Sequence, residues 1–280
     1  MEQLIPGLYI VATPIGNLEE ITKRALFVLE NADYLFCEDT RELKKLISIF
    51  NIKTEDKRII SLHEHNEMEK AQRVVGLISE GKVVAYTSDA GMPAISDPGS
   101  KLVNEVLNAQ QNVFVVSGAS AVINAVAQSG FDTSEFTFLG FFPRTAKDEK
   151  KFVEKLKRIS HTVVFFESPK RISKTLKLLV EEIPDTRAVV CRELTKKFEE
   201  VNRDKISELS KKYNTETKGE CVVVIEGLEP QFDADESKNE IEKAIKLLKR
   251  NKVSVKDSIE ILAPLVGMPK NEIKKIYLED

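Results

Sequence analysis

The stretch VVAYTSDAGMPAISDPG, residues 83–99, joins five mostly apolar residues to a loop that is rich in turn-forming residues. VVAYT predicts a buried strand, because apolar residues at consecutive positions suit a sheet that is covered on both faces. The loop holds two glycines, two prolines, two aspartates and two serines, whereas a turn from strand to helix needs far fewer. Because ligands bind beyond the carboxyl ends of strands in open α/β sheets, this loop indicates a binding site.

Strands of this kind alternate with stretches of helical periodicity along most of the chain. The alternation predicts a parallel sheet flanked by helices in the first part and a second α/β layer after it. The predicted strands are residues 8–12, 34–38, 58–62, 83–87, 113–117, 136–141, 162–167, 188–193 and 221–226. The predicted helices are residues 19–31, 40–50, 67–80, 99–110, 119–128, 147–158, 169–182 and 204–212.

The chain divides into three predicted segments. Residues 1–117 and 118–228 are an N-terminal and a C-terminal α/β domain, and residues 229–280 are a linker and a small helical appendage. In the appendage, Gly267 predicts a turn, and Pro269 predicts the first turn of a last helix. Two interpretations of the appendage stay open: a reader of nucleic acid, and an element for packing or dimerisation.

Composition limits the class of protein. Of 280 residues, 42% are hydrophobic and 31% charged, which is ordinary for a globular protein. No apolar run approaches the roughly 18 residues that a membrane helix needs, and the first residues predict no signal peptide. The three cysteines lie far apart in sequence without CxxC spacing, which predicts reduced core thiols and a cytoplasmic location.

Charge is spread unevenly along the chain. The net charge of −3 argues against a general binder of polyanions. Residues 144–177, however, hold eleven Lys and Arg against four Asp and Glu, and residues 237–275 hold ten against five. Such runs indicate either solvated helix faces or local basic surfaces.

The common nucleotide and metal motifs are absent from the sequence. No GxG occurs, so the dinucleotide fingerprint is missing. GLISEGK, residues 76–82, matches the first part of a P-loop, but Val83 follows where Ser or Thr is required. His63 and His65 flank Glu64, yet no third ligand stands at a suitable spacing, so a polar cluster near a ligand is favoured over a metal site.

Polar or glycine-bearing loops follow five predicted strands of the first domain. They are TPIGN (13–17), Asp39–Arg41, His63–His65, residues 88–99 and GASA (118–121). Because the strands are predicted to be parallel, these loops should gather at one edge of the sheet. Pro14 and Gly16 give a rigid turn and then a position without a side chain, which permits close approach of a ligand.

Seven motifs, in order along the chain, resemble one known family. They are TPIGNL, EDTR, SLHEHNE, SDAGMPAISDPG, FLGFFPR, FFESPKR and CRELTKKFEE. The sequence resembles the bacterial 16S ribosomal RNA 2′-O-ribose cytidine methyltransferases of the tetrapyrrole methylase superfamily. The resemblance implies two α/β domains with S-adenosylmethionine in the cleft between them, and methylation of a cytidine ribose in the decoding region of 16S ribosomal RNA. It also implies the small ribosomal subunit as a partner, and a homodimer.

The resemblance transfers the family's cofactor contacts to particular residues. The residues that it implies for S-adenosylmethionine are Pro14, Gly16, Asp89, Gly91, Pro93, Ser120, Ala121, Phe142 and Leu194. The family's turn usually begins with Pro-Gly where this chain has Ser117-Gly118, which loosens the turn without removing a backbone hydrogen-bonding group. Asp97 precedes Pro98 and a helical stretch, so it is instead predicted to cap that helix.

Candidates for catalysis and RNA binding complete the predicted site. The candidates for polar catalytic roles are Asp39, Arg41, His63 and Lys196. For each, another reading stays open: an Asp39–Arg41 salt bridge, a structural hydrogen bond of His63, and a phosphate contact of Lys196. The residues predicted to contact RNA are Arg144, Lys170, Arg171, Lys196 and Lys197. The competing functions are a tetrapyrrole methyltransferase and a non-catalytic S-adenosylmethionine-binding protein of the ribosome.

Overall fold

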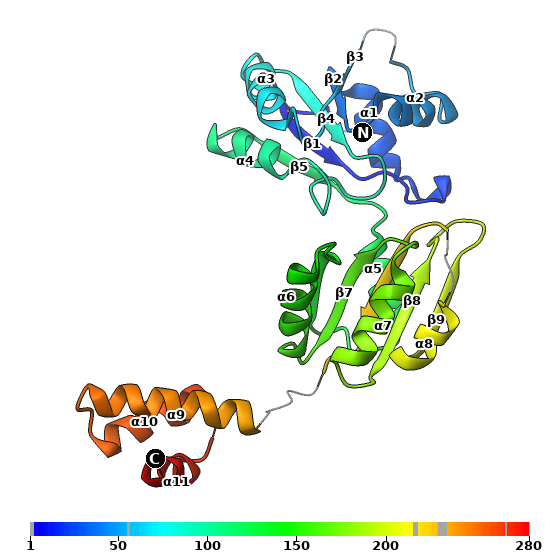
Figure 1. Ribbon diagram of the computed structural model, residues 1–280. Coiled ribbons are helices and arrows are strands. Elements are labelled where there is room, and N and C mark those ends of the chain that lie inside the picture. The colour runs from blue at the N-terminus through cyan, green and yellow to red at the C-terminus, as the bar shows by residue number, and fades with distance from the viewer. Residues whose placement is uncertain (1–2, 55–56, 215–217, 229–233, 267, 280) are drawn as a thin grey trace. The chain divides into compact units, whose positions relative to one another are not determined.

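The computed structural model describes residues 3–54, 57–214, 218–228, 234–266 and 268–279 (Figure 1). The chain forms two compact units, residues 1–228 and residues 229–280. The first unit holds two five-stranded sheets, and the described part of the second unit holds three helices. Among the described residues, no helix has both the length and the apolar character to span a bilayer.

The first sheet is parallel throughout, as the alternation of strands and helices predicts. Its strands run in the order β3-β2-β4-β1-β5, with β1 (Gly7–Val11), β2 (Tyr34–Cys37), β3 (Arg58–Ser61), β4 (Val83–Thr87) and β5 (Val113–Val116). Its helices are α1 (Lys23–Asn31), α2 (Thr40–Ile49), α3 (Glu67–Ser79) and α4 (Ser100–Asn108), with a short 3-10 helix η1 (Leu18–Glu20). The helices α1 and α2 pack on one face and α3 and α4 on the other, so the central strands β1 and β4 are buried at every position.

The second sheet is mixed, because β6 and β7 pair in parallel while the other neighbours pair antiparallel. Its order is β6-β7-β10-β8-β9, with β6 (Phe136–Phe141), β7 (Thr162–Glu167), β8 (Arg187–Arg192), β9 (Glu200–Lys205) and β10 (Cys221–Ile225). The helices α6 (Ala146–Lys157), α7 (Ile172–Glu182) and α8 (Ile206–Lys212) pack on one face, and α5 (Ala121–Ser129) packs on the other. The last strand in sequence, β10, therefore lies in the middle of the sheet.

Strand β9 departs from the sequence-based prediction, which has a helix over residues 204–212 and no strand before it. Glu200–Lys205 instead pairs with β8 along its whole length, and α8 begins only at Ile206. Because β9 is an edge strand with polar residues at nearly every position, it lacks the apolar run that marks a buried strand. Its structure depends on pairing with β8, and the local sequence pattern carries no information about that pairing.

The unit of residues 229–280 consists, in its described part, of α9 (Ala234–Arg250), α10 (Val255–Val266) and α11 (Lys270–Glu279). Their facing apolar side chains form one small core, in which Ile245 and Ile273 are fully buried. The predicted helical appendage is thus confirmed, whereas the predicted turn at Gly267 lies outside the described residues. The domain boundary near residue 118 stays a prediction.

The three cysteines lie inside the two sheets, on β2, β8 and β10. Each is buried and unpaired, as its position in an apolar run predicts. Burial raises the pKa of Cys37 and Cys221 to about 12 and that of Cys191 to about 11. These thiols are therefore packing groups rather than nucleophiles.

Glu67, the first residue of α3, caps the distant helix α4. Its side chain is buried, and its Oε1 accepts hydrogen bonds from the backbone N–H groups of Gly99 at 2.9 Å, Lys101 at 2.9 Å and Leu102 at 3.2 Å. These donors belong to the start of α4, where N–H groups have no partner within the helix. A carboxylate suits this position, because the macrodipole makes the helix N-terminus positive.

The sequence-based prediction that Asp97 caps this helix is therefore wrong. The helix begins at Ser100, and its N-cap position is Gly99, whose φ of 128° places it in the left-handed region. An Asp-Pro pair before a helix is typical of a cap, but Glu67 already accepts from the first-turn donors. Asp97 is consequently available for another role.

We expect Glu67→Ala to lower the free energy of unfolding by about 2–3 kcal/mol, because it leaves buried N–H donors unpaired. Glu67→Gln retains an acceptor oxygen and should cost about 1 kcal/mol. Urea denaturation followed by circular dichroism measures both changes. The control is Glu69→Ala in the same helix turn, whose side chain is 77% exposed and pairs with Lys70. Equal losses for Glu67→Ala and Glu69→Ala would contradict the capping role.

Candidate functional site

Two loops at the carboxyl end of the first sheet are joined by backbone hydrogen bonds. The N–H of Thr13 donates to the carbonyl of Gly91 at 2.9 Å, and the N–H of Gly91 donates to the carbonyl of Thr13 at 3.1 Å. This antiparallel bridge ties the loop after β1 to the loop after β4, and these two strands are neighbours in the sheet. The two loops therefore form one connected rim.

The loop of residues 88–99 has a strained backbone. Ala94 and Ser96 have φ angles of 68° and 62°, in the left-handed region that residues with a Cβ seldom adopt. The Tyr86 side chain is buried in the core, and its hydroxyl donates to the carbonyl of Pro98 at 3.0 Å. This hydrogen bond connects the loop to the core of the first sheet. Backbone strain of this kind persists only where the surroundings enforce it, and it concentrates at functional sites.

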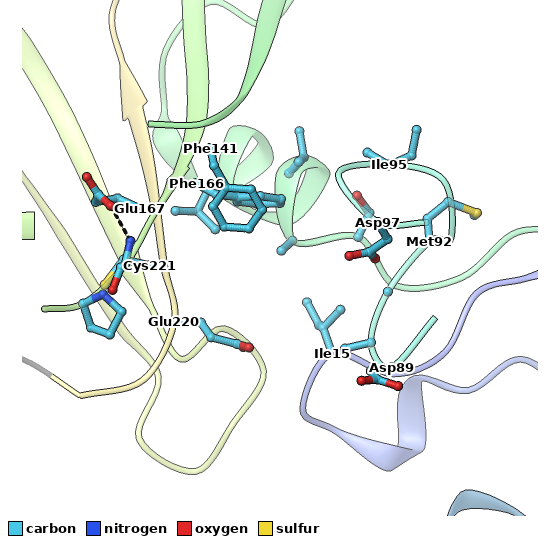
Figure 2. Close-up of a pocket in the computed structure, with 18 of the residues that line it drawn as sticks. Ile15, Asp89, Met92, Ile95, Asp97, Phe141, Phe166, Glu167, Glu220 and Cys221 are labelled. Carbon is cyan, nitrogen blue, oxygen red and sulfur yellow. Dashed lines mark hydrogen bonds between the residues drawn. The ribbon is translucent and has the colours of Figure 1, made fainter. Parts of the chain in front are cut away.

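A cavity of about 480 Å³ opens beside this loop, within the unit of residues 1–228 (Figure 2). Its lining residues are Ile15, Glu38, Asp89, Ala90, Gly91, Met92, Ile95, Asp97, Ser120, Ala121, Val122, Phe141, Phe166, Glu167, Ser168, Pro169, Glu220, Cys221 and Val222. Figure 2 shows Asp89, Asp97 and Ile95 on one side of the cavity, across from side chains of the second sheet such as Phe166 and Glu167. The volume falls within the range of pockets that bind small molecules and cofactors.

Five acidic residues line this cavity, and no Lys or Arg lines it in the part of the chain that the structure describes. They are Glu38, Asp89, Asp97, Glu167 and Glu220. Glu167 lies 3.6 Å from Arg171 and Glu220 lies 2.9 Å from Lys196, whereas no Lys or Arg among the described residues pairs with the other three. Burial raises the pKa of Glu38, Asp89 and Glu167, and burial together with the charge of Glu38 raises the pKa of Asp97 to about 6. A bound cation would offset both the loss of hydration and the mutual repulsion, so the cavity favours a small cationic ligand.

An apolar wall completes the cavity. The centroids of the Phe141 and Phe166 rings lie 5.2 Å apart, and Phe141 is 61% exposed. Ile95, on the loop of residues 88–99, is also exposed. Large apolar side chains at a cavity mouth offer a surface to a planar or apolar part of a ligand.

A smaller cavity of about 220 Å³ shares Asp89 with the larger one. Its lining residues are Thr13, Pro14, Gly16, Leu18, Glu42, Leu43, Lys45, Leu46, Ile49, Thr87, Ser88 and Asp89. It is thus built from the loop after β1, the helix α2 and the end of β4. A ligand group in the smaller cavity would meet a ligand in the larger cavity at Asp89.

The residues predicted to bind the cofactor fall into two sets. Those that line a cavity are Asp89, Gly91, Ser120 and Ala121 in the larger one and Pro14, Gly16 and again Asp89 in the smaller one. Pro93, Phe142 and Leu194 line neither cavity. Phe142 is 2% exposed and packs against Phe152 and Phe165, while Leu194 is buried in the core beside α5. The cofactor contacts predicted for Pro93, Phe142 and Leu194 therefore stay predictions.

Asp39 and Arg41 form the salt bridge that the sequence left open as an alternative. The Asp39 carboxylate also accepts from the N–H of Arg41 at 2.8 Å and so caps α2. The hydrogen bonds from Arg41 lower the pKa of Asp39 to about 2, which makes this carboxylate a weak base. The backbone N–H of Asp39 donates to Oδ1 of Asp89 at 3.0 Å, which links the start of α2 to the loop after β4.

Lys196 packs against the loop after β1, where its side chain fills the space that a Cβ on Gly16 would need. Its Nζ lies 3.0 Å from a carboxylate oxygen of Glu193 and 2.9 Å from one of Glu220. Desolvation lowers the pKa of Lys196, but the hydrogen bonds to Glu220 and Glu193 outweigh it, so the pKa is raised. A lysine acts as a general base only when its pKa is lowered, so these contacts argue against that role.

His63 lines neither cavity, and its contacts fit the structural interpretation. Its backbone N–H donates to Oδ1 of Asn66 at 2.9 Å, and its Nε2 lies 3.3 Å from Nδ2 of the same residue. Asn66 also donates to the carbonyl of Ser61 at 3.3 Å. The imidazole thus belongs to the turn that joins β3 to α3.

Arg171 points inward, although the sequence predicts an RNA contact for it. Its guanidinium donates to the carbonyls of Phe142 and Pro143 and lies 3.6 Å from carboxylate oxygens of Glu149 and Glu167. It therefore fixes the segment between β6 and α6 and is not a free ligand for phosphate. Among the other residues predicted to contact RNA, the exposed ones are Arg144, Lys170 and Lys197.

Sequence reasoning missed several residues of the larger cavity. Glu38, Phe141 and Glu167 lie at or directly after the carboxyl ends of β2, β6 and β7, and that position was the signal that could have found them. Glu220 and Cys221 lie where the antiparallel strand β10 begins, so a rule for parallel strands does not find them. These residues supply the second-sheet side of the cavity.

Comparison with known proteins agrees with this architecture. The sequence profile of the tetrapyrrole (corrin/porphyrin) methylases matches residues 7–210. Ribosomal RNA small subunit methyltransferase I of Halalkalibacterium halodurans is 38% identical, over 98% of this chain and 95% of its own length. The protein of that name from Thermotoga maritima is 43% identical, over 79% of this chain and 99% of its own length.

The crystal structure of diphthine synthase shares the fold, with a TM-score of 0.61 at 17% identity over 79% of this chain and 89% of its own. The chain therefore belongs to the tetrapyrrole methylases, and within them to the family of ribosomal RNA small subunit methyltransferase I.

Proposed function

We propose that this protein transfers the methyl group of S-adenosylmethionine to the 2′-hydroxyl of a cytidine in the decoding region of 16S ribosomal RNA. The observation that carries the proposal is a cavity with an apolar wall and three acidic residues that no Lys or Arg pairs among the described residues, Glu38, Asp89 and Asp97, in a chain of this family. Relatives at 38% and 43% identity bear the name ribosomal RNA small subunit methyltransferase I, which supports the small-subunit RNA as substrate. The ribose position and the nucleotide rest on the resemblance of the seven motifs.

S-adenosylmethionine is the methyl donor of this family, and the larger cavity suits its chemistry. When bound, it supplies a methyl group on a positively charged sulfur, which is already a strong electrophile. Asp89 and Asp97 would face its cationic end, and Phe141 and Phe166 would face its adenine ring. The backbone of residues 88–99 is already fixed, so its carbonyls lose little entropy when they bind a cation.

The contribution of the chain is to align the reactants and to remove one proton. Alignment of the acceptor oxygen, the methyl carbon and the sulfur supplies about 7–11 kcal/mol in well-oriented systems, and a positioned base adds about 10²–10⁴-fold. Asp89 lines both cavities and has no salt bridge among the described residues, whereas the hydrogen bonds from Arg41 lower the pKa of Asp39 to about 2, so Asp89 is the better base. We assign Asp89 as the acceptor of the 2′-hydroxyl proton, with the nucleoside in the smaller cavity. Asp39 and Arg41 are positioning residues, because their salt bridge and the Asp39 cap fix the start of α2, where the backbone N–H of Asp39 donates to Asp89.

RNA contacts are proposed at Arg144, Lys170 and Lys197, which are exposed on the unit that holds the cavities. Phosphate contacts of this kind set the affinity and its salt dependence. A ribose within a helix is hard to reach, so the target nucleotide must be unstacked from its neighbours. The homodimer and the cytoplasmic location stay predictions.

The first experiment tests the reaction itself. Small ribosomal subunits from a strain that lacks this gene should accept label from methyl-labelled S-adenosylmethionine in the presence of the protein. Alkaline hydrolysis of the RNA should then leave the label in a dinucleotide, because a 2′-O-methyl group blocks cleavage at that ribose. Label on a base, or transfer only to a uroporphyrin-type acceptor, would contradict the proposal, and cofactor binding without any transfer would favour a non-catalytic role.

Asp89→Asn should lower turnover by about 10²–10⁴-fold, because it removes the proposed proton acceptor. The loss of one negative charge beside a cation should also weaken S-adenosylmethionine binding, by about tenfold. Single-turnover methylation and calorimetry measure the two effects separately. Glu181→Gln, at an exposed position of α7, is the control for loss of one carboxylate. Unchanged turnover would remove Asp89 as the base, and unchanged affinity would remove it from the cofactor site.

Binding of S-adenosylmethionine should weaken as the pH falls from about 8 to about 5. The reason is that burial and Glu38 raise the pKa of Asp97 to about 6, so its charge is present above that pH and is lost below it. S-adenosylhomocysteine, whose sulfur is neutral, should show a smaller dependence. Asp97→Asn should bind more weakly at the higher pH and with a flatter profile. Calorimetry at several pH values tests this, and equal profiles for the two ligands would refute it.

A further inference from the structure

The outer face of α6 carries an unusual concentration of positive charge. A shallow surface hollow of about 530 Å³ lies along this face and is lined by Lys147, Lys150, Lys151, Glu154, Lys155 and Arg158. The buried residues Phe152, Val153 and Leu156 project from the other side of the helix into the core of the second sheet. At 3.6 residues per turn the two sets lie on opposite faces, so the hollow faces solvent along the whole helix.

Four of these cations have no ion-pair partner among the residues that the structure describes: Lys147, Lys150, Lys155 and Arg158. Surface lysines elsewhere pair with a Glu three residues away, as Lys45 does with Glu42 and Lys211 with Glu208. The charge on α6 is therefore not neutralised locally, although the chain as a whole is acidic with a net charge of −3. An uncompensated stripe of this kind attracts polyanions.

Helix stability does not account for the stripe. Lys155 and Arg158 lie at the C-terminal end, where the macrodipole favours cations. Lys147 lies in the first turn, where the macrodipole disfavours a cation, and Lys150 lies in the second, where the macrodipole has little effect. The dipole thus favours a cation at neither position, which points to a role outside the helix.

We propose that this face of α6 docks the phosphate backbone of ribosomal RNA, and the proposal rests on the function proposed above. From Lys147 to Arg158 the helix is about 16 Å long, enough to follow several consecutive phosphates of one strand. Phe141, which lines the larger cavity, ends β6, and α6 begins shortly after it at Ala146. A strand held along α6 thus starts close to the cavity, and its bound phosphates set the register of the nucleotide that enters.

The test compares two fourfold variants of the full chain. The stripe variant carries Lys147→Gln, Lys150→Gln, Lys155→Gln and Arg158→Gln, and the control carries Lys23→Gln, Lys53→Gln, Arg73→Gln and Lys101→Gln at exposed positions around the first sheet. The dissociation constant for naked 16S ribosomal RNA is measured at several KCl concentrations. Four lost contacts to a single strand should flatten the slope of log K against log salt by about 3, and binding near 0.1 M salt should weaken by about 10–100-fold. The control slope should change by less than about 1.

Two further measurements separate docking from a structural effect. The stripe variant should keep the wild-type melting temperature and affinity for S-adenosylmethionine, because glutamine is a good helix former and the hollow lies outside the cavity. A charge-keeping variant, with Lys147→Arg, Lys150→Arg, Lys155→Arg and Arg158→Lys, should retain the wild-type salt slope.

A wild-type slope and affinity in the stripe variant would overturn the proposal. Weaker binding to small subunits with unchanged binding to naked RNA would also overturn it, in favour of a ribosomal protein as the partner. The proposed function is tested by a different measurement, the transfer of label to RNA by the wild-type protein. Absence of that transfer would contradict the proposed function, whatever the salt slopes show.

Discussion

The pair of hydrogen bonds between Thr13 and Gly91 is the constraint on which the site depends. It joins the loops after β1 and β4, and the larger cavity takes Ile15 and Gly91 from the two joined segments. The Tyr86 hydroxyl donates to the carbonyl of Pro98 in the loop after β4, and the bridge connects that loop to the loop after β1. Order at the site thus comes from the central strands of the first sheet, which are buried on both faces.

The fold was predictable because its signals are local. Apolar runs such as VVAYT mark buried strands, and the helices between them carry amphipathic periodicity, so the first sheet follows directly from the sequence. Strand β9 was not predictable in this way, because Glu200–Lys205 owes its structure to pairing with β8. The polarity of an edge strand looks like that of a loop or a helix face.

The candidate site was predictable in part, for a related reason. Asp89 and Gly91 stand in a loop whose composition is itself unusual, and both line the larger cavity. Asp97 was misread because a helix cap is usually supplied by the adjacent residue, whereas here Glu67 reaches across from another helix. Glu220 reaches the cavity from an antiparallel strand, and no pattern within its own segment reveals that position.

The position of β10 has a consequence for how the protein is made. Cys221–Ile225 is the last strand of its sheet to leave the ribosome, yet it lies between β7 and β8 and pairs with both. The hydrophobic core around the second sheet cannot form until this strand has been synthesised. A nascent chain therefore exposes the apolar faces of β7 and β8 until then. Glu220 and Cys221 arrive with the same strand, and the cavity is therefore completed only after β10 has been synthesised. A cavity built in this way forms only once both sheets of residues 1–228 have been synthesised and paired.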